Sequence, residues 1–234
     1  MNKMINNNDL NCLGLAIICA GGYGKEVYDT AIRSHRLAGN MRRIIFVDDF
    51  AEKLNLDEKI NFKNIILTEE FINSNLKNIF NAVVAIGEPS LRQKLYQKLI
   101  NKKVNFTTVI DPTSCISDSV KILKGVIVGP FASIQADVYL AENVAINSAV
   151  IIGHDTTVMA NSVISSQVNL GGGVTVGEST YIGMGVLIKE GVKIGSNSIV
   201  GMGSVVYNDI PDGVIALGNP ARVMRNNENQ KVFK

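Results

Sequence analysis

The sequence predicts a small Rossmann-like α/β domain with a parallel sheet, followed by a left-handed parallel β-helix. Two observations predict this fold class. Residues 14–110 alternate short apolar runs with amphipathic stretches, which is the pattern of parallel strands joined by crossover helices. Residues 116–206 instead repeat with a period of six. We therefore expect a flexible N-terminus (1–13), an α/β domain (14–112), a β-helix (113–217) and a C-terminal tail (218–234).

The α/β half is predicted from six segments. "LGLAIICAGG" is a buried strand that ends in glycines, and "YGKEVYDTAIRSH" continues it with helical spacing. "RRIIFVDDF" and "NAVVAIG" are two further strands. "EPSLRQKLYQKLINKK" is a helix, because Pro89 stands near its start and basic residues stand at its end. "NFTTVI" closes the set.

The second half is defined by its register. Every sixth residue from Ile116 to Val206 is Ile, Val or Leu, at sixteen positions in all. The residue four places later is usually small or β-branched, and the residue one place later is often glycine. In a left-handed β-helix each hexad forms one wall of a triangular coil, and glycines are expected to relieve the backbone at the corners. Sixteen hexads make about five coils, roughly 25 Å tall.

Composition excludes several classes of protein. The net charge is only +2 and no basic block is present, so nucleic acid is not an expected partner. The apolar runs are shorter than the ~20 residues that span a bilayer, and the start does not read as a signal peptide. Cys12, Cys19 and Cys115 are isolated, which indicates a reduced, cytoplasmic protein without disulfides. With two histidines in the chain, we expect no metal site.

The stretch "VIIGHDTTV" contains the first candidate for chemistry. His154 is third in the hexad 152–157, so its side chain should point outward. It is either an ordinary surface histidine beside a surface acid or a general base on an open wall. Asp155 could orient the ring, although adjacent strand residues point to opposite sides, and Asn147 is expected near the same edge. His35 stands at a helix end, where a solvated histidine is the usual reading.

A base without a covalent nucleophile indicates direct transfer. No Ser, Cys or Lys stands in a motif for a covalent intermediate, which favours attack by an amine or hydroxyl on an activated acyl donor. His154 would take the proton, and backbone N–H groups or Asn147 would stabilise the oxyanion.

The glycine turn and the acids have two readings each. Gly21, Gly22 and Gly24 do not form a G-x-G-x-x-G fingerprint, so a dehydrogenase is not expected. The turn either offers backbone N–H groups to a phosphate or lets the helix pack on the sheet. Asp48 and Asp49 either meet ribose or base donors or cap a helix.

Several motifs together carry a family resemblance. "INSAVIIGHDTTV" with "GNPARVMR" resembles the hexapeptide acyltransferases. "ICAGGYGKEV", "FVDDF" and "AIGEPSLRQKLYQKL" narrow this to sugar acetyltransferases typified by the bacillosamine-pathway, perosamine and 4-amino-4,6-dideoxyglucose N-acetyltransferases. The sialic acid O-acetyltransferase homologues share the layout. The resemblance covers residues 14–225.

The resemblance implies an acetyl-CoA-dependent N-acetyltransferase for bacterial surface glycans such as O-antigen, without a metal. The α/β domain would bind a nucleotide-linked amino sugar, and acetyl-CoA would bind between subunits of a homotrimer. A thin prism with few outward charges independently favours a trimer. The implied catalytic residues are His154, Asp155 and Asn147. The implied substrate contacts are Gly21, Gly22, Tyr23, Asp48, Asp49, Gly87 and Arg92. The implied CoA contacts are Gly172, Met184, Met202 and Pro220.

Three positions depart from the family pattern. Val163 stands where relatives often have a second histidine, Tyr23 replaces the histidine of a "GHG" turn, and Glu88 replaces a common Asn. A single histidine gives little help to a weak hydroxyl nucleophile, so we expect transfer to the 4-amino group of a 4-amino-4,6-dideoxyhexose. The alternatives are a sugar O-acetyltransferase of the sialic acid type and a non-catalytic β-helix scaffold. The nucleotide, the sugar stereochemistry and the pathway stay open.

Overall fold

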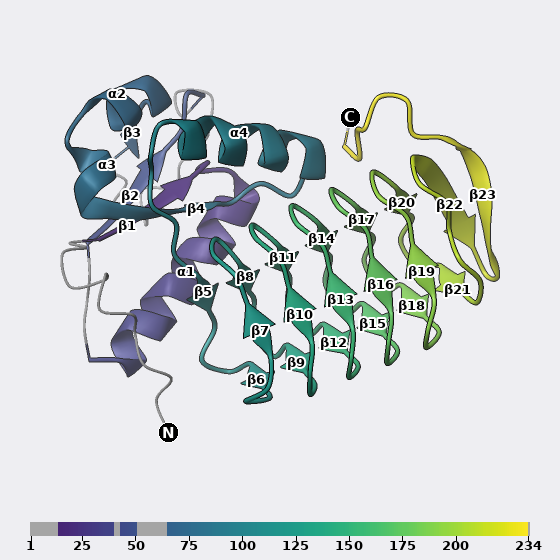
Figure 1. The fold of residues 1–234 in the computed structure, drawn as a ribbon. Coiled ribbons are helices and arrows are strands. Elements are labelled where there is room, and N and C mark those ends of the chain that lie inside the picture. Colours follow the sequence, from purple (N-terminus) through teal and green to yellow (C-terminus); the bar gives the residue numbers. More distant parts are fainter. Residues whose placement is uncertain (1–13, 40–42, 51–64, 234) are drawn as a thin grey trace.

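The N-terminal half is a parallel α/β domain. The structure, a computed structural model, describes residues 14–39, 43–50 and 65–233 (Figure 1), so the expected flexible segment 1–13, with Cys12, lies outside the described residues. The sheet has the order β3-β2-β1-β4 and all its pairings are parallel. Its strands are β1 (Gly14–Ile18), β2 (Arg43–Val47), β3 (Ile65–Ile66) and β4 (Phe80–Val84). The predicted Rossmann-like parallel sheet is confirmed. Because β4 returns to the other side of β1, the topological switch point lies between these two strands.

Four helices accompany this sheet among the described residues. Both predicted helices are present, α1 (Gly22–Leu37) and α4 (Pro89–Asn101), whereas the short α2 (Thr68–Asn73) and α3 (Leu76–Ile79) were not foreseen. α1 joins the two halves of the chain. Its buried Val27 and Ala31 belong to one apolar cluster with Val109 and Ile127 of the second half.

The second half is a triangular β-helix of two-residue strands. Three parallel sheets form its walls. Wall 1 contains β5 (Val109–Ile110), β8 (Ile127–Val128), β11 (Ala145–Ile146), β14 (Val163–Ile164), β17 (Tyr181–Ile182) and β20 (Ile199–Val200). Wall 2 contains β6 (Cys115–Ile116), β9 (Ser133–Ile134), β12 (Ile151–Ile152), β15 (Asn169–Leu170), β18 (Leu187–Ile188) and β21 (Val205–Val206). Wall 3 contains β7 (Lys121–Ile122), β10 (Tyr139–Leu140), β13 (Thr157–Val158), β16 (Thr175–Val176) and β19 (Lys193–Ile194).

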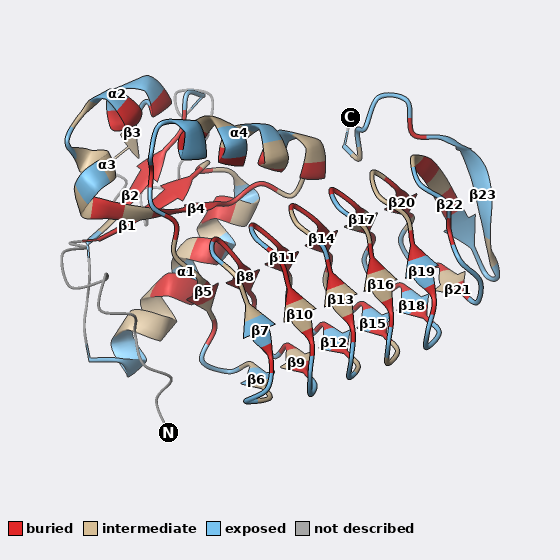
Figure 2. Ribbon diagram, in the orientation of Figure 1, coloured by how far each residue is buried: buried red, intermediate tan, exposed pale blue. Residues whose placement is uncertain are grey.

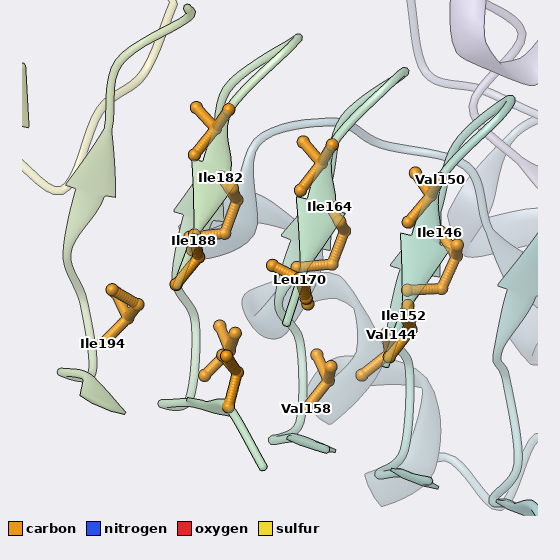
Figure 3. Close-up of a cluster of buried hydrophobic side chains, with 14 of the residues drawn as sticks. Val144, Ile146, Val150, Ile152, Val158, Ile164, Leu170, Ile182, Ile188 and Ile194 are labelled. Carbon is orange, nitrogen blue, oxygen red and sulfur yellow. The ribbon is translucent and has the colours of Figure 1, made fainter. Parts of the chain in front are cut away.

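The predicted hexad register is confirmed. The aliphatic residue that ends each strand from Val128 to Val206 is at most 4% exposed. Figure 3 shows Ile146, Ile152 and Val158, from three successive walls, directed into the prism. Ile116 and Ile122 are only partly buried, because β6 and β7 each pair with a strand on one side only. The buried column of aliphatic side chains is the core that fixes the outward direction of the residues between them.

The glycines of the repeat have two roles, of which the expectation covered only the relief of the backbone at corners. The left-handed backbone of each corner falls three residues after the inward aliphatic residue, for example at Asp155 (φ 58°) and Gly173 (φ 67°). The glycines one place after the aliphatic residue are needed for close stacking. A Cβ on Gly153 would lie 2.5 Å from the backbone nitrogen of Gly172 in the next coil.

The domain boundaries differ from the predicted ones at both ends of the β-helix. β5 pairs with β8 in wall 1, so the β-helix begins at Val109, inside the predicted 14–112 domain. The segment "NFTTVI" is therefore split, because Phe106 bridges Ala82 at the edge of the α/β sheet. Within the predicted tail, β22 (Val214–Gly218) and β23 (Ala221–Asn226) form a hairpin that extends wall 1.

The last residues return to the α/β domain. The backbone N–H groups of Val232 and Phe233 donate to Oε2 of Glu88, at 2.9 and 3.1 Å. The Phe233 ring lies edge-on to Tyr181 of wall 1, with 5.6 Å between ring centroids. Figure 1 shows this return beside the beginning of α4, and Figure 2 shows that β23 itself is largely exposed. None of the described helices is long and apolar enough to cross a membrane.

Candidate active site

His154 and Asp155 form a hydrogen-bonded pair at the edge between walls 2 and 3. They follow β12, and Nδ1 of His154 lies 2.7 Å from Oδ2 of Asp155. Both side chains are exposed, at 71% and 67%. The sequence-based expectation that the two side chains point to opposite sides was wrong, because Asp155 is not in a strand conformation. Its positive φ of 58° turns the carboxylate toward the imidazole.

The next coil seats the imidazole. Gly172 follows β15 on the same edge, and a Cβ there would lie 2.7 Å from both Cε1 and Nε2 of His154. The N–H of Gly173 donates to the carbonyl of His154 at 2.7 Å, which fixes the backbone as well. Because Nδ1 faces the carboxylate, Nε2 is the nitrogen that can accept a proton from a substrate.

Asn147 does not join this pair within one chain. It follows β11, at the edge between walls 1 and 2, whereas His154 lies at the next edge of the coil. The expectation of a shared edge was wrong, since seven residues exceed one hexad and so one wall. The side chain of Asn147 instead lines a cleft against α1, and its Oδ1 is buried without a hydrogen-bond partner.

This cleft separates α1 from the edge between walls 1 and 2. It has a volume of about 180 Å³. Its residues on the α1 side are Tyr23, Glu26, Val27, Asp29, Thr30 and Arg33, and opposite them are Ile127, Gly129, Pro130, Ile146, Asn147, Ser148 and Ser166. The hydroxyl of Tyr23 is also buried without a partner. Gly129 lets the turn of Asn147 approach, because a Cβ there would lie 3.0 Å from the carbonyl carbon of Asn147.

The glycines of the turn before α1 have different roles: one allows the helix to pack on the sheet, and two leave the backbone open. A Cβ on Gly24 would lie 2.2 Å from the carbonyl oxygen of Cys19, so Gly24 is the glycine that lets α1 pack on β1. A Cβ on Gly21 or Gly22 would meet nothing within 4 Å, so their backbone is open to a ligand. Burial, with the charges of Asp48 and Asp49, raises the pKa of the Cys19 thiol to about 12. Cys19 therefore stays protonated and is not a nucleophile.

The two acids after β2 hold backbone groups. Asp48 is buried, its Oδ2 accepts the N–H of Ala20 at 2.8 Å and its Oδ1 accepts the N–H of Phe50 at 2.7 Å. Asp49 accepts the N–H of Thr68, the first residue of α2, at 2.7 Å. Each oxygen of Asp48 thus accepts one backbone N–H, and because a carboxylate has further lone pairs, its assignment as a substrate contact stays a prediction. Asp49 is exposed and acts as a helix cap, the second of its two readings.

Arg92 lies inside the protein. It is 0% exposed and donates to the carbonyl oxygens of Val84, Ile86 (3.2 Å) and Asn143 (2.6 Å). Burial lowers its pKa to about 10, so it stays charged near neutral pH. It has no exposed surface for the expected direct contact with a substrate, and it ties α4 to β4 and to the β-helix. Gly87 faces the Phe233 ring: a Cβ built on Gly87 would lie 3.6 Å from Cε2 of Phe233.

The residues expected along the CoA path are divided between two edges. Met184 and Met202 are exposed on the edge between walls 1 and 2, and Gly172 is on the edge between walls 2 and 3. Pro220 is exposed in the turn between β22 and β23. Wall 2, between the two edges, carries the exposed apolar side chains Ile151 and Leu187. A hollow of about 270 Å³ on wall 2 is lined by Asn169, Gly171, Leu187, Ile188, Lys189, Glu190, Val205, Val206 and Tyr207.

Two features of the site were not singled out from the sequence. The cleft-lining side of α1 was missed because its direction depends on how α1 packs on wall 1. The exposed apolar residues of wall 2 carry a signal in the hexads, since each precedes an inward aliphatic residue. Val163, at the place of the second family histidine, lies in wall 1 and is 1% exposed. Among the described residues, no three His, Cys, Asp or Glu side chains are grouped to hold a metal ion.

Comparisons with known proteins agree with this architecture. Residues 14–99 match the family model of the PglD N-terminal domain, and residues 173–208 match that of the bacterial transferase hexapeptide. A search of curated proteins finds no significant match.

Three solved structures illustrate the similarity. A histidine-to-asparagine mutant of perosamine N-acetyltransferase from Caulobacter crescentus, in complex with CoA and GDP-perosamine, is 30% identical, with a TM-score of 0.80 over 91% of this chain and 97% of that one. The acetyltransferase domain of PglB from Neisseria gonorrhoeae is 30% identical, with a TM-score of 0.82 over 91% and 100%. WeeI from Acinetobacter baumannii is 25% identical, with a TM-score of 0.80 over 90% and 99%.

The fold and the site define a class. A parallel α/β domain on a left-handed β-helix, with a histidine–acid pair at an exposed edge, is a hexapeptide-repeat acyltransferase. Within that class, the chain belongs to the acetyl-CoA-dependent nucleotide-sugar N-acetyltransferases that join a PglD-type N-terminal domain to hexapeptide repeats.

Proposed function

We propose that the protein transfers the acetyl group of acetyl-CoA to the 4-amino group of a nucleotide-linked 4-amino-4,6-dideoxyhexose, with His154 as the general base. The observation that carries this proposal is the His154–Asp155 pair, with Nδ1 held at 2.7 Å from the carboxylate on an exposed edge. Nε2 then accepts a proton while Asp155 stabilises the charged ring.

The reaction is a direct displacement. The neutral amine attacks the thioester carbonyl, and Nε2 of His154 takes the proton that the nitrogen loses as the C–N bond forms. The C–S bond then breaks, and the imidazolium returns the proton to the leaving thiolate, so the products are the N-acetyl sugar and CoA. The tetrahedral oxyanion needs a hydrogen-bond donor, for which the backbone N–H groups of the neighbouring turns and Asn147 are the candidates.

The arrangement of the edges supports a site shared between subunits. His154, Asp155 and Gly172 lie on one edge of wall 2, and Asn147, Met184 and Met202 lie on its other edge. Burying Ile151 and Leu187 of wall 2 against further copies of the chain removes exposed apolar surface. In a closed trimer the first edge of one subunit then faces the second edge of the next. Acetyl-CoA would lie along that seam.

The relatives support the assignment of the base. The Caulobacter enzyme was solved with CoA and GDP-perosamine as two variants of one histidine, to asparagine and to alanine. This chain has only two histidines, His35 and His154. His35 lies in the last turn of α1, which supports assigning the role of base to His154.

An acceptor panel tests the proposed function. UDP-, dTDP- and GDP-linked 4-amino-4,6-dideoxyhexoses are offered with acetyl-CoA beside their 4-hydroxy analogues and free sialic acid, and release of the CoA thiol is followed. We expect fast turnover with one amino sugar, weak turnover with its hydroxy analogue and none with sialic acid. Preference for a hydroxyl acceptor would establish the O-acetyltransferase alternative, and no thiol release with any acceptor would favour a scaffold.

A further inference from the structure

The cleft between α1 and the β-helix carries unbalanced negative charge. Glu26 and Asp29 line it from α1. The one cation among its lining residues is Arg33, and its charge is engaged elsewhere. Nη2 and Nε of Arg33 lie 2.6 and 2.7 Å from Oδ2 of Asp111, which is fully buried. With that pair neutral, the two carboxylates of α1 determine the sign of the potential in the cleft.

The cleft is also lined by a polar side chain that lacks a partner. Oδ1 of Asn147 is buried without a hydrogen bond. A buried polar atom without a partner costs free energy, and Oδ1 can only accept. Asn147 Oδ1 and the Glu26 carboxylate both accept hydrogen bonds, so a ligand that donates N–H groups suits both of these lining residues. The cleft is therefore suited to a cationic or donor-rich group, and not to a phosphate.

The sign of this charge orients a nucleotide sugar along α1. The diphosphate is repelled by Glu26 and Asp29, and it fits the open backbone at Gly21 and Gly22, where α1 begins. Glu26 lies four residues after Gly22, about 6 Å along the helix axis. This separation is comparable with the width of one pyranose ring. The amino-sugar end of the substrate then enters the cleft beside Glu26 and Asn147.

We infer that Glu26 is a specificity-determining residue that binds the acceptor amine in its ammonium form. The inference rests on the proposed function, and it identifies which side chain of this protein selects an amino sugar over a hydroxy sugar. Glu26 is exposed to solvent, but partial burial of its carboxyl, followed by the charge of Asp29, raises its pKa, and a bound ammonium offsets both effects. The amine must lose its proton before it attacks. The attraction to Glu26 is therefore a ground-state interaction, which contributes to KM more than to kcat.

A substitution that keeps the shape of Glu26 tests the inference. Glu26→Gln removes the charge, and Glu70→Gln, an exposed acid on α2 outside the cleft, is the control. Calorimetry without acetyl-CoA measures the Kd of the preferred nucleotide-linked amino sugar and of its 4-hydroxy analogue for each protein. We expect Glu26→Gln to weaken binding of the amino sugar roughly 10-fold or more, as for loss of one charge-assisted hydrogen bond. Binding of the hydroxy analogue, and KM for acetyl-CoA, should change less than about 2-fold.

The outcomes separate this inference from the proposed function. Unchanged affinity for the amino sugar in Glu26→Gln would overturn the inference, and so would an equal loss for both sugars, because the amine would then not be the group recognised. Acetyl transfer to an amino sugar by the wild type would still stand in either case. The converse outcome is also possible. If Glu26→Gln selectively loses binding of the amino sugar, the inference is supported. If the wild type also transfers no acetyl group to any acceptor, the proposed function is contradicted.

Discussion

Oδ2 of Asp155 lies 2.7 Å from Nδ1 of His154, although the two residues are adjacent in the chain. Neighbouring side chains in a strand cannot meet in this way. The contact exists because the corner of each coil needs a residue with positive φ, and here that residue is an acid. A structural requirement of the β-helix thus places a carboxylate against an imidazole on an exposed edge.

The first prediction concerns this pair. Asp155→Asn should lower kcat by roughly 10²–10⁴-fold. Asn tolerates the left-handed backbone at this position, but its amide can donate to Nδ1 of His154 and so stabilise the tautomer with the proton on Nε2, which cannot act as a base. His154→Ala should lower kcat by a similar 10²–10⁴-fold. The double variant should be no worse than His154→Ala, since the residues act as a unit. Both side chains are exposed, so the melting temperatures of these variants should equal that of the wild type. Additive losses in kcat would show that Asp155 acts independently of His154.

The second prediction contrasts two glycines one coil apart. In Gly172→Ala the three atoms nearest the new Cβ all belong to the His154 ring, two of them at 2.7 Å, and this side chain can rotate away. We expect kcat to fall about 10-fold or more, with little change in stability. In Gly153→Ala the Cβ meets the backbone nitrogen of Gly172 at 2.5 Å, so the coils must separate. That variant should lose about 1–3 kcal/mol of stability. Thermal melts and acetyl transfer, measured on both variants, check the contrast, and full activity of Gly172→Ala would contradict it.

The β-helix was predictable from sequence because its register is local. An Ile, Val or Leu recurs every six positions and is buried in the coils, so counting along the sequence identifies the residues that point inward. The division of His154 and Asn147 between two edges follows from the same count, because seven residues exceed one wall. The roles of Asp48 and Arg92 were not predictable, since their partners come from β1, β4 and the β-helix. The cleft side of α1 likewise depends on contacts between the two halves of the chain.

The third prediction is complementation between inactive variants. If each site combines His154 of one subunit with Asn147 of the next, His154→Ala and Asn147→Ala are each inactive alone. Co-expressed subunits form mixed trimers, in which about one quarter of the sites carry both native residues. Activity should therefore reappear in the mixture. Light scattering should give a mass of about three times the 25.3 kDa of one chain. Mixed trimers without recovered activity would show that each site is built from one chain.

The fourth prediction is a pH-dependent link between the two halves. Burial acts to raise the pKa of Asp111, but the hydrogen bonds from Thr113 and Arg33 outweigh it and lower the pKa below its ordinary value. A lowered carboxyl pKa gives stability that is complete above the unfolded value of about 3.9 and is lost as the pH falls through the folded value.

Asp111→Asn should therefore be less stable than the wild type at pH 7. We expect a difference of about 1–3 kcal/mol, less than for a fully buried pair, because the Arg33 side chain is 41% exposed. The difference should shrink as the pH approaches 3. Urea unfolding at pH 7 and pH 3.5 measures it, and a difference that does not depend on pH would contradict the assignment.

The last prediction concerns the C-terminal return. Phe233 covers Gly87, and its N–H group donates to Glu88, so the tail restrains the loop that follows β4 beside the switch point of the sheet. Ligands of open α/β sheets bind at that place. Phe233→Ala should loosen the loop and raise KM for the nucleotide sugar roughly 3- to 10-fold through lost preorganisation. KM for acetyl-CoA should stay unchanged, because its proposed path lies along the seam between the edges of neighbouring subunits. Glu228→Ala, an exposed residue of the same segment, is the control. If Phe233→Ala raises KM for acetyl-CoA instead, the tail acts on the donor side of the reaction.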